Sequence, residues 1–186
     1  MSIINLMKGG FGKDKFKSKG NELGTPHEFF ERLDDEFHFT LDPCASPSNH
    51  KCENYFTEEV NGLEQDWSND VVWMNPPFGN NLKDWVKKAY NEAQNGAVVV
   101  SLIPVRSNTN WWHSYCMKAK EIRLIRGRIK FIADNGEPFS HGLPYPLALV
   151  IFQQGDHSPV LTSYDSSKQT SKPHPKDEDG EEGITN

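Results

Sequence analysis

The sequence predicts a single α/β domain with a mostly parallel sheet and helices on both faces. Two apolar runs, residues 71–74 and 97–103, have the length and composition of buried strands, and a third covers residues 147–152. Between the first two runs, apolar residues recur at helical spacing over residues 81–94. Strand, helix and strand in succession are typical of a parallel sheet covered on both sides.

Shorter patterns predict the remaining elements. Thr25 and Pro26 are typical of a helix start, with Thr25 as N-cap and Pro26 in the first turn. Gly96 is expected to end the helix over 81–94, and Pro104 is expected to end the strand over 97–103. We also expect a short strand over 37–41, a helix over 109–119, and strands over 121–125 and 129–132.

Length and composition predict one folded domain with a segment at each end. The chain has 186 residues. Residues 1–20 are rich in Gly and Lys and predict a flexible basic arm, and residues 165–186 predict a disordered acidic tail, which leaves 21–164 as the domain. An apolar run of about 18 residues is missing, so no membrane-spanning helix is expected. The cysteines form no CxxC pair, which favours a reduced, intracellular (cytoplasmic) protein.

The charge distribution is compatible with a nucleic-acid partner despite a net charge of −6. A local positive surface, and not a basic average, is what a DNA-binding face requires. One stretch has this character: Lys118, Lys120, Arg123, Arg126, Arg128 and Lys130 stand there against Glu121 alone. On charge alone, a solvated helix end and strand explain this stretch equally well.

The loop Asn75-Pro76-Pro77-Phe78 carries the clearest chemical signal. It follows a buried strand directly, and ligands of open α/β sheets bind at the carboxyl ends of strands. Two successive prolines fix the backbone and remove two amide donors, so the loop presents carbonyl acceptors beside the Asn75 side chain. An ordinary strand-ending turn is the alternative, because Asn-Pro is a common turn pair.

Such acceptors suit a planar group that bears an NH2. The amino nitrogen of adenine is a poor nucleophile, because its lone pair is delocalised into the ring. Acceptors that bind both N–H groups localise the lone pair on the nitrogen. They also stabilise the positive charge that develops on the nitrogen as a methyl group is transferred to it. The ring of Phe78 is suited to stack on the base. These residues are therefore the predicted catalytic group: Asn75, Pro76, Pro77 and Phe78.

With these motifs in order, the chain resembles the phage-type DNA N-6-adenine methyltransferases (Dam-like) over about residues 23–153. The resemblance implies a Rossmann-like domain, S-adenosylmethionine as cofactor and double-stranded DNA as partner. The segments over 41–46 and 62–67 resemble the family's cofactor loops, and the segment 102–106 followed by 110–113 also matches its pattern. The cofactor-binding residues it implies are Thr25, Pro26, Asp42, Pro43, Cys44, Ala45, Asp66, Trp67 and Asn75.

Two departures from the usual pattern concern the cofactor site. The Gly-rich fingerprint GxGxxG is absent, so the loop after Asp42 must form the equivalent turn without it. The interval from Asp42 to Asp66 barely accommodates a helix, strand and loop, so the acidic residue that binds the ribose is not assigned; Glu58 and Glu59 are candidates for it. Turn chemistry at Asp42, and an ordinary loop with a buried indole at Asp66-Trp67, remain open. Cys44, His50 and Cys52 lack a second ligand pair, so no metal site is predicted.

For DNA, the enzyme must flip the target adenine out of the stack. Expected DNA contacts are Arg106, Arg126, Arg128 and Lys130, and the polar connection over 132–146 is either a loop that reads sequence or a plain connection. Three alternatives stay open at this stage: a methyltransferase acting on RNA adenine, one acting on protein glutamine, and a non-catalytic DNA-binding module. The oligomeric state and the target sequence do not follow from the sequence.

Overall fold

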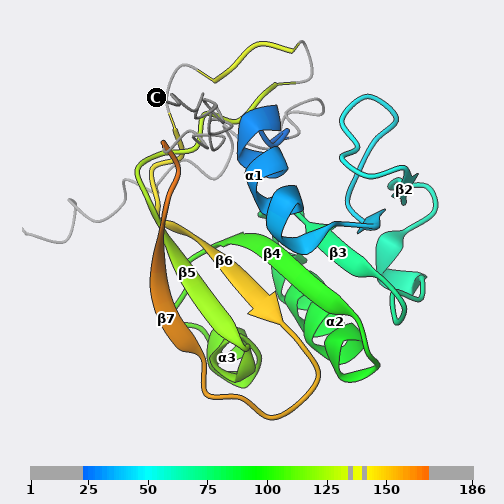
Figure 1. Ribbon diagram of the computed structural model, residues 1–186, viewed down its shortest axis with the longest axis vertical. Coiled ribbons are helices and arrows are strands. Elements are labelled where there is room, and N and C mark those ends of the chain that lie inside the picture. The colour runs from blue at the N-terminus through cyan, green and yellow to red at the C-terminus, as the bar shows by residue number, and fades with distance from the viewer. Residues whose placement is uncertain (1–22, 134–135, 140–141, 168–186) are drawn as a thin grey trace, which may run out of the picture.

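Seven strands form one mixed sheet in the computed structural model, which describes residues 23–133, 136–139 and 142–167. The strand order is β2-β1-β3-β4-β6-β5-β7 (Figure 1). Only β6 runs against the other six described strands. The strands are β1 (Leu41–Asp42), β2 (Asn54–Tyr55), β3 (Val71–Met74), β4 (Val98–Pro104), β5 (Glu121–Arg126), β6 (Leu147–Phe152) and β7 (Val160–Asp165). This confirms the predicted α/β class with a mostly parallel sheet.

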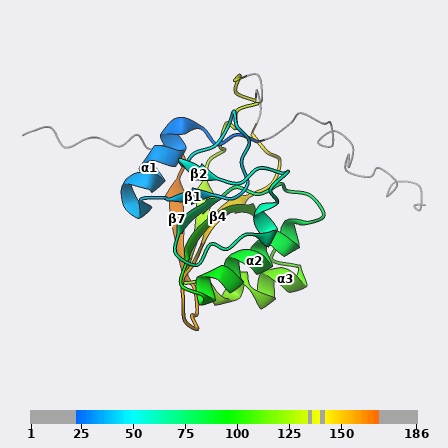
Figure 2. The same cartoon turned by 90° about the vertical axis from the view of Figure 1, so that its right-hand side faces the viewer.

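Helices lie on both faces of the sheet, as predicted. Figure 2 shows α1 (His27–Phe37) on one side and α2 (Leu82–Gln94) with α3 (Asn110–Ser114) on the other. Two short 3-10 turns, Gly62–Glu64 and Cys116–Lys118, complete the described elements. None of the helices in the described ranges has the length and apolar character needed to span a membrane.

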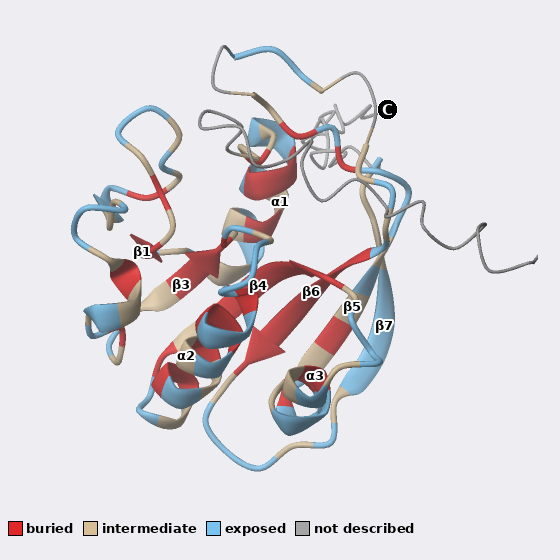
Figure 3. Ribbon diagram, turned by 180° about the vertical axis from the view of Figure 1, so that it is seen from behind, coloured by how far each residue is buried: buried red, intermediate tan, exposed pale blue. Residues whose placement is uncertain are grey.

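Alternating side chains of the central strands build two separate cores. On β4, Val99 and Ile103 pack with α2, whereas Val100 and Leu102 pack with α1. Strand β6 is buried along its whole length, whereas the edge strand β7, on the other side of β5, is largely exposed (Figure 3). Strands buried on both faces read as continuous apolar runs, which is why β3, β4 and β6 could be predicted from the sequence.

Around α1 the structure corrects the sequence prediction. The helix continues to Phe37, and the predicted strand over 37–41 shrinks to the two residues of β1. His38 takes a left-handed conformation with φ 57°, and its N–H donates to the Asp34 carbonyl, which ends the helix. The alternation of Phe37 and Phe39 that suggested a strand instead brings their two rings into a stack.

Thr25 is not the N-cap that the sequence predicted. Pro26 occupies the cap position of α1, and no side chain caps the helix there. The Thr25 side chain is buried and accepts a hydrogen bond from the Asn75 side chain instead. A tertiary partner has therefore displaced the local capping role that residue type alone suggested.

Later in the chain, three further expectations change. The helix predicted over 109–119 divides into α3 and a 3-10 turn, because Tyr115 departs from helical backbone angles. The strand predicted over 129–132 is absent from the sheet, and Ile132 makes only isolated bridges, to Gly24 and Pro138. Strand β7 was not predicted; four of its six residues are exposed, so it lacks the apolar run of the central strands. The predicted arm over 1–20 and residues 168–186 of the predicted tail lie outside the described residues.

The direction in which successive strands are added to the sheet reverses at β1. Strand β2 pairs on one side of β1 and β3 on the other, and all three are parallel. The loops that follow β1 and β3 therefore leave the same end of the sheet next to each other. In open α/β sheets this switch point is where ligands bind.

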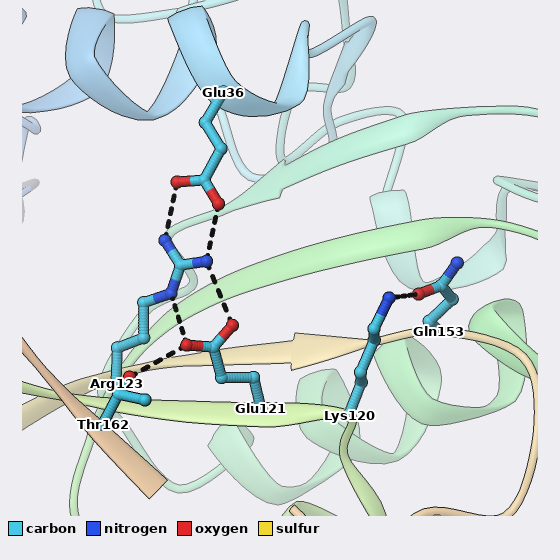
Figure 4. A network of polar contacts seen from close by, with 6 residues as sticks. All are labelled: Glu36, Lys120, Glu121, Arg123, Gln153 and Thr162. Carbon is cyan, nitrogen blue, oxygen red and sulfur yellow. Dashed lines mark hydrogen bonds and ion pairs between the residues drawn. The ribbon is translucent and has the colours of Figure 1, made fainter. Parts of the chain in front are cut away.

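One ion-pair network joins α1 to the strands β5 and β7 at one edge of the sheet (Figure 4). The Arg123 guanidinium on β5 donates to both carboxylate oxygens of Glu36 on α1, at 2.7 and 2.6 Å. It also donates to both oxygens of Glu121, at 2.9 and 3.0 Å, and Thr162 on β7 donates to Glu121 at 2.9 Å. These contacts hold the pKa of Glu121 below its usual value. The network ties α1, β5 and β7 together.

Arg123→Ala should lower the free energy of unfolding by about 1–2 kcal/mol, because it removes bidentate bonds from an Arg side chain that is largely buried. Lys120→Ala is the matched control, since Lys120 is exposed and makes a single side-chain bond to Gln153. Urea denaturation of both variants measures the difference. Equal midpoints for R123A and K120A would contradict a structural role for the network.

Candidate functional site

Several of the predicted site residues lie at the carboxyl end of the sheet, where the six co-directional strands stop. Asp42 ends β1, and Asn75 follows β3 directly. Arg106 comes two residues after β4, and Arg126 ends β5. Because neighbouring parallel strands end at the same level, the catalytic loop, the cofactor loop and the predicted DNA contacts face one side of the molecule.

Both hydrogens of the Asn75 amide are held by one segment near the start of the described chain. Nδ2 donates to the Leu23 carbonyl at 2.7 Å and to the Thr25 hydroxyl at 3.2 Å. The other amide atom, Oδ1, is buried and has no hydrogen-bond partner among the described residues. A buried acceptor without a partner is costly, and such atoms are found where a ligand completes the bonding.

The rest of the catalytic loop is held from both sides. Pro76 is buried, Pro77 is exposed and Phe78 is half-buried. The Phe78 ring meets the buried Phe131 ring edge-on, with centroids 6.4 Å apart. Phe78 also packs against both hydrophobic cores, so its ring position is fixed rather than free.

Asp42 organises the loop that follows β1. Its carboxylate accepts backbone N–H bonds from Cys44 at 3.3 Å and from Lys51 at 3.1 Å. The backbones of Phe56 and Ala45 close the loop, with Phe56 N–H donating to the Asp42 carbonyl and Ala45 N–H to the Phe56 carbonyl. Burial raises the pKa of Asp42 to about 6, although both backbone bonds act to lower it. Ionisation there is favoured by any cationic group that binds nearby.

The two cofactor segments predicted from the sequence touch each other through Gly62. A Cβ on Gly62 would lie 2.2 Å from the Pro43 carbonyl oxygen, so only glycine permits this approach. Half-buried apolar side chains pack on the core that α2 covers, and they come from three loops at this end: Cys44, Phe56, Leu63 and Phe78. Burial raises the pKa of the Cys44 thiol, which makes it an apolar lining residue and not a nucleophile.

These observations match what S-adenosylmethionine requires of its site. The cofactor has a cationic ammonium and sulfonium, and a buried carboxylate, Asp42, lies at the switch point. The Gly62–Pro43 approach and the apolar side chains around it supply a close backbone and an apolar wall.

Three of the predicted cofactor residues lie differently from the rest. Trp67 is fully buried, donates from its indole N–H to the Gly62 carbonyl at 3.0 Å, and presents no surface to a ligand. Asp66 is exposed and accepts from the Ser68 N–H, and its pKa is lowered by that bond; no described contact joins it to Asp42 or Asn75. Pro26 caps α1 and also lines a cavity on the α1 face.

The ribose candidates Glu58 and Glu59 are both exposed, in the turn that follows β2. Leu23 and Phe131 were missed altogether. Leu23 acts through its backbone, and Phe131 lies in a segment that we expected to be a strand, so neither carried a sequence signal.

The basic stretch over 118–130 divides into two parts. Lys118 and Lys120 precede β5 and lie at the amino end of the sheet, far from the catalytic loop. Arg126, Arg128 and Lys130 lie at the carboxyl end and are exposed. Arg106 is exposed at the same end and its guanidinium sits over the Tyr145 ring, 5.3 Å from the centroid. Only the second part is placed to contact a substrate at the catalytic loop.

Arg128 and Lys130 also line a cavity of about 510 Å³ between α1 and the segment after β5. Ser166, Ser167 and Gly127 contribute to the same wall. Gly142 packs so closely on the Arg128 side chain that a Cβ would lie 2.6 Å from its Cβ. The stem of Arg128 is therefore supported while its charged head reaches solvent.

Comparisons with known proteins show the family to which this chain belongs. The sequence model of the family "DNA N-6-adenine-methyltransferase (Dam)" matches residues 13–174. A DNA N-6-adenine-methyltransferase of Haemophilus phage HP1 is 32% identical over 152 residues, which cover 80% of this chain and 88% of the relative. A protein of the same description from Escherichia phage T1 is 30% identical over 115 residues, or 61% of this chain and 48% of the relative.

The sheet, its switch point and the loop after β3 define a Rossmann-like methyltransferase that depends on S-adenosylmethionine. Within that class, the chain belongs to the DNA N-6-adenine-methyltransferase (Dam) family of the phage type. The resemblance expected from its motifs is confirmed, and the enzymatic class and cofactor with it. The family assignment favours DNA over the RNA and protein acceptors, and over a non-catalytic module.

If Asp42 meets a cationic part of the cofactor, its affinity for S-adenosylmethionine should fall as the pH drops through the pKa of about 6. Protonation removes the negative charge that attracts the cation. The sign is opposite for folding: the pKa in the fold exceeds the ordinary 3.8, so this group stabilises the protein at acid pH and loses that contribution as the pH rises through about 6.

Calorimetric titration with S-adenosylmethionine from about pH 5 to about pH 8 measures this dependence. Asp42→Asn should bind weakly with a flatter profile, because the titrating carboxylate is gone. A wild-type dissociation constant that stays constant across this range would contradict the proposed contact.

Proposed function

We propose that this chain methylates the exocyclic N6 of a flipped adenine in DNA, with Asn75 Oδ1 and the Pro76 carbonyl as the acceptors of the amino hydrogens. The observation that carries the proposal is the buried Oδ1 without a partner at the carboxyl end of β3. Its amide nitrogen is already engaged twice, so the oxygen is the atom available to a substrate. An adenine amino group supplies the complementary donor.

The chemistry follows from this arrangement. Two acceptors on the amino hydrogens draw the nitrogen lone pair out of conjugation and make it available for attack. S-adenosylmethionine, when bound, would supply an electrophilic methyl group on a sulfonium, whose S–C bond breaks on transfer to leave a neutral thioether. As the new N–C bond forms, positive charge develops on the nitrogen, and the preorganised oxygens of Asn75 and Pro76 stabilise it. The nitrogen then loses one proton to water, because the methylated ammonium-like nitrogen is acidic.

Phe78 holds the base for this reaction. Its ring is fixed between the two cores and braced edge-on by Phe131. Stacking of a base on such a ring is worth on the order of 1–3 kcal/mol, which offsets part of the few kcal/mol needed to flip the nucleotide. A rigid ring loses little entropy when the base arrives.

The cofactor is expected on the other side of Asn75, at the switch point. We assign Asp42 to its cationic end, and the backbone from Pro43 to Ala45, with Cys44, to the wall beside it. Thr25, Pro26, Asp66 and Trp67 support this region indirectly: Thr25 and Trp67 are buried, and Asp66 and Pro26 bond or pack with their own neighbours.

DNA is expected to lie across the carboxyl end, over Arg106 and the segment after β5. Arg126, Arg128 and Lys130 are exposed there and suited to contact phosphates. The predicted sequence-reading connection over 132–146 falls between the end of β5 and the start of β6, which both lie at this end of the sheet. Phe131 and Phe139 are joined by a backbone bond of 2.8 Å, so part of this connection folds as a turn. We propose that this turn contacts the duplex beside the flipped base.

Asn75→Ala should reduce methyl transfer on the order of 10²–10³-fold while S-adenosylmethionine still binds, because it removes a preorganised acceptor from the reacting nitrogen. The assay is transfer of a labelled methyl group to duplex DNA, with N6-methyladenine identified in the product. Asn69→Ala is the matched control, since Asn69 is exposed at the opposite end of β3. Parallel loss of cofactor binding and transfer in N75A would mean that the loop serves the cofactor instead.

Arg128→Ala should weaken DNA binding and make its salt dependence shallower, because one phosphate contact releases about one counterion. We expect the slope of log K against log salt to decrease by about 0.9. Fluorescence anisotropy at several salt concentrations measures it, with Lys87→Ala on the exposed face of α2 as the control. An unchanged slope for R128A would remove this residue from the DNA interface.

A further inference from the structure

The segment Leu23–Thr25 decides which atom of the Asn75 amide faces the substrate. A primary amide has an acceptor oxygen and a donor nitrogen of nearly equal shape, and rotation by half a turn exchanges them. If the nitrogen faced the adenine amino group, two donors would oppose each other. The proposed reaction therefore requires that this rotation be prevented.

Hydrogen bonds from one side prevent it. The Leu23 carbonyl is an acceptor only, so the amide group that faces it at 2.7 Å must be the nitrogen. The Thr25 hydroxyl lies 3.2 Å from the same nitrogen and takes its second hydrogen. Rotating the amide would lose the bond to Leu23 and place Oδ1 against its carbonyl oxygen, whereas the Thr25 hydroxyl, which is only slightly exposed, could hydrogen-bond to the amide in either orientation.

We infer that Thr25 is a positioning residue for methyl transfer: the Leu23 carbonyl determines which amide atom faces the substrate, and Thr25 holds the second amide hydrogen and so fixes the direction in which Oδ1 points. This inference rests on the proposed function of Asn75. It assigns Thr25 a role different from the cofactor contact that the family resemblance implied. A buried hydroxyl that already bonds to Asn75 is better placed to orient that side chain than to reach a ligand.

The Leu23–Thr25 segment is in turn held in place by backbone hydrogen bonds to Ile132, in the connection after β5. Gly24 and Ile132 exchange two backbone hydrogen bonds, at 2.9 and 2.8 Å. A Cβ on Gly24 would lie 3.0 Å from the Ile132 carbonyl oxygen, so the two backbones approach closely. Phe131, the residue next to Ile132, contacts Phe78. The same short stretch thus fixes both the orientation of Asn75, through Gly24, and the ring that receives the base.

Thr25→Val tests the inference, because valine keeps the shape of threonine and removes the acceptor. We expect kcat for DNA methylation to fall about 10-fold to 100-fold, since a misoriented catalytic group costs that much. The dissociation constant for S-adenosylmethionine and the KM for DNA should change by less than about 2-fold, because a residue that acts only by orienting Asn75 affects the chemical step and not ligand binding. Thr25→Ser, which restores the hydroxyl, should recover most of the lost kcat.

Two controls separate the possible outcomes. Thr162→Val removes an exposed threonine hydrogen bond on β7, far from the catalytic loop, and reports any general effect of this exchange. Thermal unfolding of every variant shows whether T25V remains folded. An inactive N75A with a fully active T25V would overturn the positioning role and leave the proposed function intact. A T25V variant that loses cofactor affinity in proportion to activity would assign Thr25 to the cofactor. A fully active N75A would overturn the proposed function itself.

Discussion

The hydrogen bonds between the Asn75 amide and the Leu23–Thr25 segment are the contact on which the site depends. They join the first described residues of the chain to the residue that follows β3, which is 52 positions after Leu23 and 50 after Thr25. Without them, the loop after β3 would be a rigid turn with a freely rotating amide. With them, it presents an oxygen in a fixed direction. The prolines restrict the backbone of the loop, and the bonds restrict its one polar side chain.

The proposed cofactor loop after β1 is also ordered by a buried polar side chain, Asp42. Hydrogen bonds within the loop offset the cost of burying it. The Asp42 carboxylate holds two backbone N–H groups of its own loop, and that loop is closed further by backbone bonds to Phe56. A Gly-rich fingerprint is unnecessary in this arrangement. The close approach that glycine usually permits next to the first strand is supplied by Gly62, from a different segment. The short interval between Asp42 and Asp66 is accommodated because the chain forms only the two-residue β2 and a 3-10 turn there.

Sequence patterns predicted the parts of the fold that burial determines. Strands β3, β4 and β6 and helix α2 have continuous or periodic apolar residues, and their bounds were close to those observed. Prediction failed where tertiary contacts override local preference. Thr25 has the residue type of a cap and serves Asn75 instead. Phe37 and Phe39 alternate as in a strand, although a left-handed residue lies between them. Strand β7 pairs with β5 through its backbone and has too few buried side chains to show a pattern. For the candidate site, residue type and order predicted roles for Asn75 and Asp42, whereas the hydrogen bond to the Leu23 carbonyl and the close approach of Gly62 to Pro43 depend on the folded structure and have no sequence pattern.

The single reversed strand, β6, has a consequence for how such enzymes diverge. Because β5 ends and β6 begins at the same end of the sheet, the connection between them leaves and re-enters without crossing a face. Lengthening the exposed stretch over 136–138 of this connection costs little free energy, since the entropy of loop closure grows only slowly with length. Insertions there would leave the hydrophobic cores and the catalytic loop unchanged while they remodel the surface beside it. The topology thus provides a place where the surface next to the predicted catalytic loop can change in length while the sheet stays the same.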